Sequence, residues 1–150
     1  MTYVPIGPDG VVQRVRLAAY AWCEEGDAVL LARVAAGYPG EGMWALPGGG
    51  LDFGEDPAEG LVREMVEETG LTGRIDGLLD IRSGVYEPAE TTSGHRIHFI
   101  GILYRVTKTG GELRDEPDGS TDQAAWIPLN ELDALPLVDT AVWARGIVGR

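Results

Sequence analysis

Hydrophobic residues between positions 57 and 70 recur at every third or fourth place, as they do along one side of an amphipathic helix. The stripe comprises Ala58, Leu61, Val62, Met65, Val66 and Thr69, and its spacing predicts a helix that packs on a sheet. Asp56 is placed to cap this helix, and Pro57 fits its first position, where no amide hydrogen is needed. Glu59 completes an Asp-x-x-Glu capping box, and Gly70 ends the helix.

Shorter apolar runs on both sides of this helix predict strands. We expect strands over residues 11–23, 28–34, 43–46, 74–85, 96–107 and 123–127, a turn over 108–111, and helices over 128–135 and 138–148. Residues 96–107 are apolar on both faces, which predicts a central strand. Residues 1–10, punctuated by proline and glycine, predict a loose tail or an edge segment. The loop over residues 112–122 is acidic, with room for a short strand at its start.

The interleaving of strands and helices predicts the fold class. It indicates an α/β protein, built as an α/β/α sandwich around a mixed β-sheet. A length of 150 residues fits one domain that spans residues 1–150.

Three glutamates form a second stripe on the predicted helix. Glu64, Glu67 and Glu68 lie within about one quadrant of the helix, at roughly 100° per residue. Their mutual repulsion, about 0.2–0.5 kcal/mol per pair, and the helix dipole near the C-terminus both oppose this placement. A solvated acidic face therefore explains the cluster poorly. A hard divalent cation such as Mg²⁺ or Mn²⁺ would remove the conflict, since it binds carboxylate and carbonyl oxygens and shares its shell with substrate phosphate.

A glycine-rich turn over residues 48–54 precedes the helix, where missing Cβ atoms allow positive φ and close approach of the backbone to a ligand. The whole stretch over residues 49–71 resembles the Nudix box of MutT-like proteins, G-x5-E-x7-R-E-U-x-E-E-x-G-U, in which U is a bulky aliphatic residue. Its fixed positions are filled by Gly49, Glu55, Arg63, Glu64, Met65, Glu67, Glu68, Gly70 and Leu71. Residues 44–48 resemble the strand that leads into that box.

The resemblance implies a Nudix-type sandwich and a pyrophosphohydrolase activity. Such an enzyme uses Mg²⁺, or Mn²⁺, to cleave the pyrophosphate linkage of a nucleoside diphosphate joined to another group, by attack of water on phosphorus. Nucleoside triphosphates, oxidised nucleotides and ADP-sugars are the substrates to consider.

The resemblance also implies roles for individual residues. Glu64, Glu67 and Glu68 would bind the metal, assisted by the Gly49 carbonyl and by Glu55. Arg63 would pair with a carboxylate and fix its orientation. Its other reading, a surface ion pair, contributes little. We therefore expect Glu64, Glu67 and Arg63 to be catalytic.

The general base stays open between Glu64 and a carboxylate of the acidic loop. That loop offers Asp115, Glu116, Asp118 and Asp122. We expect Glu116 and Asp122, together with Tyr86, to contact the substrate. Tyr86 resembles a marker of some dinucleoside-polyphosphate hydrolases and Pro88 a marker of many ADP-ribose hydrolases, so together they do not decide the leaving group. Polarity of its loop accounts for His95.

Composition narrows the partners. Twelve Lys and Arg against 24 Asp and Glu give a net charge of −12, which disfavours a nucleic-acid polymer. Cys23 is the only cysteine, so the chain suits a reducing compartment. No apolar run of about 18 residues is present, which predicts no membrane span and a cytoplasmic location. We expect a small nucleotide ligand and leave a homodimer open.

Two other function classes compete with the enzyme. One is a Nudix-like domain that senses a nucleotide without hydrolysing it, but such domains usually carry damaged boxes. The other is a purely structural acidic protein, which leaves the clustered glutamates unexplained.

Overall fold

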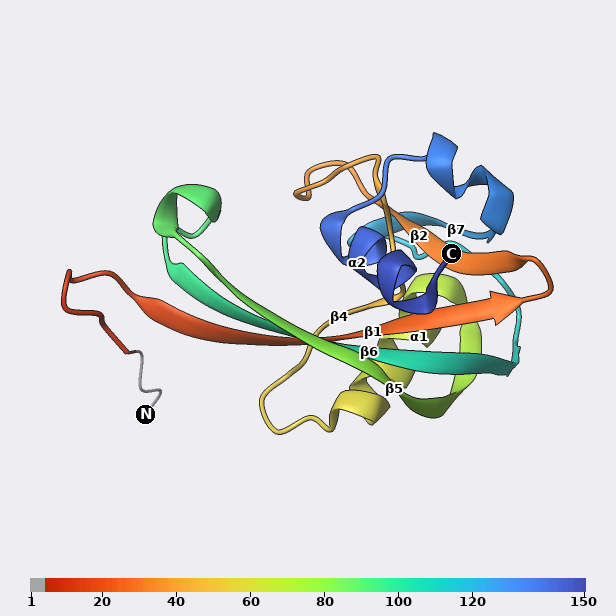
Figure 1. Cartoon of the computed structure of the whole chain (residues 1–150), viewed down its shortest axis with the longest axis horizontal. Coiled ribbons are helices and arrows are strands. Elements are labelled where there is room, and N and C mark those ends of the chain that lie inside the picture. Colours follow the sequence, from red (N-terminus) through yellow and green to blue (C-terminus); the bar gives the residue numbers. More distant parts are fainter. Residues whose placement is uncertain (1–4) are drawn as a thin grey trace.

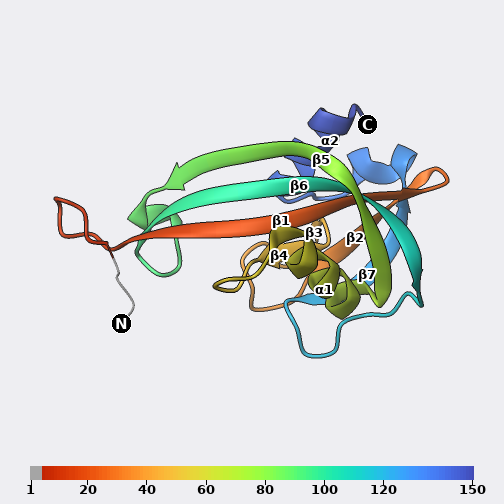
Figure 2. The ribbon, with the colours of Figure 1, turned by 90° about the horizontal axis from the view of Figure 1, so that it is seen from below.

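A mixed sheet lies between the two α-helices, as Figures 1 and 2 show. The computed structural model describes residues 5–150. Its strands are β1 (Gln13–Glu25), β2 (Ala28–Val34), β3 (Trp44–Ala45), β4 (Gly48–Gly50), β5 (Leu71–Tyr86), β6 (Arg96–Gly111) and β7 (Thr121–Pro128). The α-helices are α1 (Pro57–Thr69) and α2 (Asp139–Val148), and the 3₁₀ helices are η1 (Pro88–Glu90) and η2 (Leu129–Ala134).

The strands form one seven-stranded sheet in the order β3-β2-β1-β6-β5, with β4 paired to β1 and β7 paired to β2. The β1 and β6 strands are parallel, whereas β6 and β5 are antiparallel. The predicted mixed sheet and α/β/α layering are therefore confirmed, and β6 is a central strand as its two apolar faces predicted.

Each helix covers its own face of the sheet. Leu61 and Met65 of α1 pack against a buried cluster that includes Ala21 and Cys23 of β1. On the other face, Ala141 and Ala144 of α2 belong to a cluster with Trp22 of β1. Alternating residues of β1 thus anchor both helices, which fixes the position of α1 relative to the sheet.

Three local predictions fail. Residues 108–111 do not turn but continue β6, because Gly110 and Gly111 pair with the first residues of β5. No strand begins the acidic loop in the described structure, and the helix predicted over 128–135 is the shorter 3₁₀ helix η2. Residues 1–4 of the predicted tail lie outside the described residues, while Ile6 forms an antiparallel bridge with Val12.

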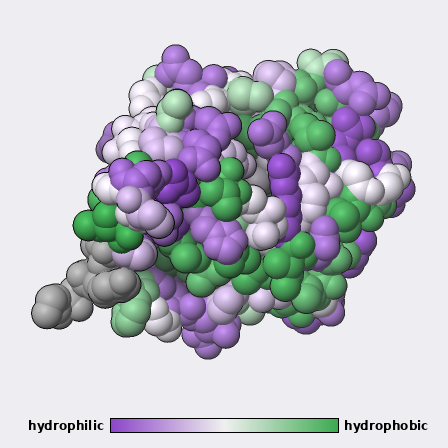
Figure 3. All heavy atoms as spheres, turned by 60° about the vertical axis from the view of Figure 1, so that its left-hand side comes forward, coloured by the Kyte–Doolittle hydropathy of each residue, from purple (hydrophilic) through white to green (hydrophobic). Residues whose placement is uncertain are grey.

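The long strands extend beyond the helices. The start of β1, the end of β5 and the start of β6 project as a three-stranded arm (Figures 1 and 2). Val15, Leu17, Ile81 and Val85 of this arm are exposed, and apolar residues lie among polar ones on the face seen in Figure 3. None of the helices in residues 5–150 has the length and apolarity needed to cross a membrane.

Candidate functional site

Helix α1 begins and ends as its sequence predicts. The Asp56 carboxylate accepts a hydrogen bond from the Glu59 amide at 3.1 Å, and Pro57 takes the first turn. Gly70 adopts the left-handed conformation, with φ of 77°, and donates to the Val66 carbonyl. The caps therefore fix which residues face the sheet.

The glycine turn lies directly against β1. Strand β4 pairs antiparallel with β1, with Gly48 opposite Tyr20. A Cβ atom on Gly48 would stand 2.1 Å from the Ala19 carbonyl oxygen, closer than real Cβ contacts allow. Only glycine permits this approach, and it brings Gly49 to the wall of a cleft that α1 also lines.

This cleft has a volume of about 560 Å³, which is within the usual range for small-molecule sites. One part of its wall is polar and comes from the glycine turn and α1, with Glu64 and Glu68. Another part is aromatic or apolar and includes Tyr20, Tyr38 and Leu46. The cleft therefore combines a wall suited to a base or sugar with a wall of hard oxygen atoms.

The acidic wall contains a buried carboxyl group. Glu68 is only 3% exposed, and burial, the neighbouring Glu64 and then Glu116 raise the pKa of its carboxyl well above its usual value. The Gly48 amide hydrogen bond acts in the opposite direction but more weakly. Within residues 5–150 no Lys, Arg or His forms an ion pair with Glu68. Such a carboxylate calls for a counter-charge, and Mg²⁺ fits this set of hard oxygen donors.

Arg63 holds the carboxylates around it in place. Its Nε donates to Glu55 Oε2 at 2.8 Å, and its Nη2 donates to Glu55 Oε1 at 3.1 Å. It also reaches Glu64 and Glu67, at 3.1 Å each. The hydrogen bond to Glu55 is the main cause that raises the pKa of Arg63, and the pKa of Glu55 is lowered in turn. Both oxygens of Glu55 are thus engaged, which makes Glu55 the anchor of Arg63.

Gly60 makes room for that anchor. It lies inside α1, where glycine costs about 1 kcal/mol relative to alanine. A Cβ atom there would stand 2.7 Å from Glu55 Oε1. Glycine at position 60 therefore destabilises the helix slightly but leaves the space that the Glu55 carboxylate occupies.

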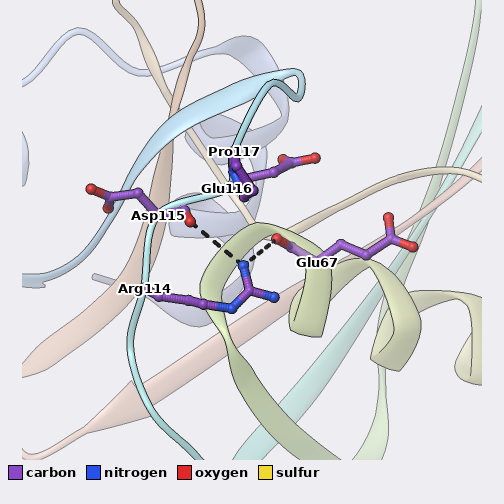
Figure 4. A pocket seen from close by; sticks show the side chains of 5 residues that line it. All are labelled: Glu67, Arg114, Asp115, Glu116 and Pro117. Atoms are coloured by element: carbon purple, nitrogen blue, oxygen red, sulfur yellow. Dashed lines mark hydrogen bonds between the residues drawn. The ribbon is translucent and has the colours of Figure 1, made fainter.

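Glu67 does not line the cleft that Glu64 and Glu68 line. Its side chain is 51% exposed, and it lines a separate hollow of about 720 Å³ with Arg114, Asp115, Glu116 and Pro117 (Figure 4). Among residues 5–150, no three His, Cys, Asp or Glu side chains stand close enough to hold a metal ion. The assignment of metal ligands stays a prediction for the whole set, namely Gly49, Glu55, Glu64, Glu67 and Glu68.

Arg114 offsets the helix dipole that disfavours these glutamates. Its guanidinium donates to the Val66 carbonyl at 3.1 Å and to the Glu67 carbonyl at 3.5 Å, while its amide donates to the Thr69 carbonyl at 2.9 Å. A cation at the C-terminus of a helix stabilises it. The acidic stripe therefore destabilises the helix less than the sequence alone indicated.

The acidic loop reaches the cleft through Ser120 and Thr121, and none of its carboxylates lines the cleft. Glu116 accepts a hydrogen bond from the Thr121 hydroxyl at 2.8 Å and acts on Glu68. Asp122 instead pairs with Arg33 at 2.8 Å, and Asp115 accepts from the Ala124 amide. Neither of these two lines the cleft.

Tyr86 lies on the arm and not among the cleft residues. Its ring packs edge-on against Phe99, with centroids 6.3 Å apart. Sequence reasoning missed Arg16 and Tyr20, which do line the cleft. Both residues lie within a mostly apolar segment that was interpreted as a strand, so nothing in the local sequence marked them as part of a site. Burial raises the pKa of Tyr20.

Comparison with known proteins finds a matching family and several relatives of this chain. The family model described as NUDIX domain matches residues 13–147. An ADP-ribose pyrophosphatase from Methanocaldococcus jannaschii is 38% identical over 97 residues, covering 65% of this chain and 53% of that protein. A MutT-like protein from Streptomyces ambofaciens is 33% identical over 91 residues, covering 61% and 51%. The chain thus spans about half the length of these relatives.

The fold comparison agrees. The crystal structure of a MutT NUDIX hydrolase from Burkholderia pseudomallei superposes with a TM-score of 0.75 at 25% identity. The match covers 89% of this chain and 98% of that chain.

Proposed function

The chain belongs to the NUDIX family, and on this premise we propose that it hydrolyses the pyrophosphate linkage of a nucleoside diphosphate joined to another group, with Mg²⁺ as cofactor. In this reaction a water oxygen bonds to phosphorus and the bridging phosphorus–oxygen bond breaks. The proton of the water passes to a carboxylate, and the leaving group departs with the bridging oxygen.

One observation carries the proposal. A nearly buried carboxyl group, that of Glu68, lies beside Glu64 in the wall of a cleft large enough for a nucleotide, and the charge of Glu116 also acts on it. Burying carboxyl groups next to one another destabilises a fold. The same groups offer oxygen ligands to a divalent cation that also binds the substrate phosphate. A bound divalent ion would neutralise charge on the phosphate and lower the pKa of a bound water.

The chain's own residues have distinct tasks in this proposal. Glu64 and Glu68, with the Gly49 carbonyl, would hold the ion. Arg63, anchored on Glu55, orients Glu64. Either Glu64 or Glu116 takes the proton of the attacking water. Glu116 is preferred within the acidic loop because its charge acts on Glu68, whereas Asp122 pairs with Arg33.

The test is a panel of nucleoside triphosphates, oxidised nucleotides, ADP-ribose and dinucleoside polyphosphates, incubated with Mg²⁺ or with chelator and separated by chromatography. We expect cleavage of at least one compound that stops in chelator. If nucleotides bind by calorimetry while none is cleaved with either Mg²⁺ or Mn²⁺, the domain senses nucleotides and the proposal is wrong.

A further inference from the structure

A smaller basic hollow adjoins the cleft at the base of the arm. It has a volume of about 300 Å³, and its polar lining consists of Arg14, Arg16, Ser93 and His95. No carboxylate lines it. Arg16 and Gly50 line both this hollow and the cleft, so the two spaces meet at the glycine turn. We call the hollow the basic pocket.

Arg16 lies close against the glycine turn. Its guanidinium atoms stand 3.3–3.4 Å from the place where a Cβ atom on Gly50 would be. The Arg16 guanidinium therefore lies beside the glycine turn, and Glu64 and Glu68 line the same cleft. A phosphate chain that starts at the acidic wall and passes the glycine turn reaches Arg16 next.

Neither of these two cations is paired with an acidic side chain in the described part of the chain. Within residues 5–150, neither Arg14 nor Arg16 forms an ion pair with a carboxylate, although the chain has twice as many acidic as basic residues. Nδ1 of His95 is buried and has no hydrogen-bond partner among the described residues. A buried polar atom without a partner is costly, and a bound ligand at this pocket could supply one.

We propose that the basic pocket binds the terminal phosphate of a nucleoside triphosphate. An ADP-sugar has an uncharged sugar in place of that third phosphate, so nucleoside triphosphates are preferred over ADP-sugars. This inference rests on the proposed hydrolysis. Guanidinium groups offer planar, two-pronged donors that match phosphate oxygens. The terminal sugar of ADP-ribose carries no charge for Arg14 and Arg16 to bind.

A binding experiment tests the pocket without relying on catalysis. Inorganic tripolyphosphate is titrated by calorimetry, in chelator, into wild type, the double variant Arg14→Gln/Arg16→Gln, and the control Arg105→Gln. Arg105 is an exposed residue of β6. Its partner in the register of β1 and β6 is Trp22, which lies far along β1 from Arg14. We expect the double variant to lose roughly 10-fold or more in affinity, since charge-assisted hydrogen bonds are lost, and the control to behave as wild type. Equal affinity in wild type and the double variant would overturn the proposal.

Kinetics with Mg²⁺ then separate the pocket from the hydrolysis itself. In the double variant we expect the ratio of kcat/KM for a nucleoside triphosphate to kcat/KM for ADP-ribose to fall roughly 10-fold or more. An equal fall for both substrates would refute the preference for triphosphates. If wild type cleaves neither compound nor any other in the panel, the proposed hydrolysis fails, and the calorimetry still decides whether the pocket binds phosphate.

Discussion

Replacing Glu68 by glutamine separates what the fold needs from what the site needs. Glu68 is 3% exposed, and the Glu64 side chain, four residues earlier on α1, is 21% exposed. An exposed like-charge pair at this spacing costs about 0.2–0.5 kcal/mol. Two charges about 6 Å apart at an effective dielectric constant of about 20 repel by about 2.8 kcal/mol. Because this pair is mostly buried, we expect Glu68→Gln to stabilise the metal-free protein by about 1–2 kcal/mol.

Melting curves in chelator and in Mg²⁺ measure this effect. For a domain of this length, about 1–2 kcal/mol corresponds to roughly 2–8 °C in Tm. When the Mg²⁺ concentration is about ten times Kd, wild type gains about 1.4 kcal/mol from binding. The variant binds the ion more weakly, so its advantage should shrink or reverse, and its hydrolysis should fall steeply.

The matched control is Glu59→Gln, in the exposed first turn of the same helix. An anion near a helix N-terminus is favourable, so this variant should be slightly less stable than wild type, both in chelator and in Mg²⁺. A metal-free Glu68→Gln protein that melts below wild type would refute the reasoning. It would mean that the Glu68 carboxylate makes a stabilising contact, such as the hydrogen bond from the Gly48 amide.

Three further predictions concern the surroundings of the site. Arg63→Lys should lower kcat markedly with little change in Tm, because an ammonium cannot make the two-pronged contact with Glu55; wild-type kinetics would leave Arg63 as a surface ion pair. Gly60→Ala should lower activity without the gain of about 1 kcal/mol expected from helix propensity, since its Cβ meets Glu55; a more stable and fully active variant in melting and turnover assays would contradict this. Burial raises the pKa of the Cys23 thiol to about 11, so the thiol is protonated at pH 8. A thiol reagent whose reaction is measured by absorbance should therefore modify Cys23 only after unfolding, and rapid labelling of the native protein would count against its burial.

Local signals in the sequence determined helix α1 and the turn before it. The caps at Asp56 and Gly70 depend on residues only a few positions away, so they can be interpreted without the fold. The same holds for β6, whose two apolar faces indicate burial on both sides. The position of Arg63 next to Glu64 in the box also indicated a paired arginine, although not which carboxylate would anchor it.

The tertiary structure decided what meets across the cleft. Glu116, and not Asp122, faces Glu68, because Arg33 on β2 holds the Asp122 carboxylate. Arg16 reaches the glycine turn only because β4 pairs with β1. These contacts depend on the register and pairing of strands distant in sequence, which periodicity along the chain does not specify. The sequence by itself therefore determined the helix that carries the glutamates, and the packing of the sheet determined which other charges surround them.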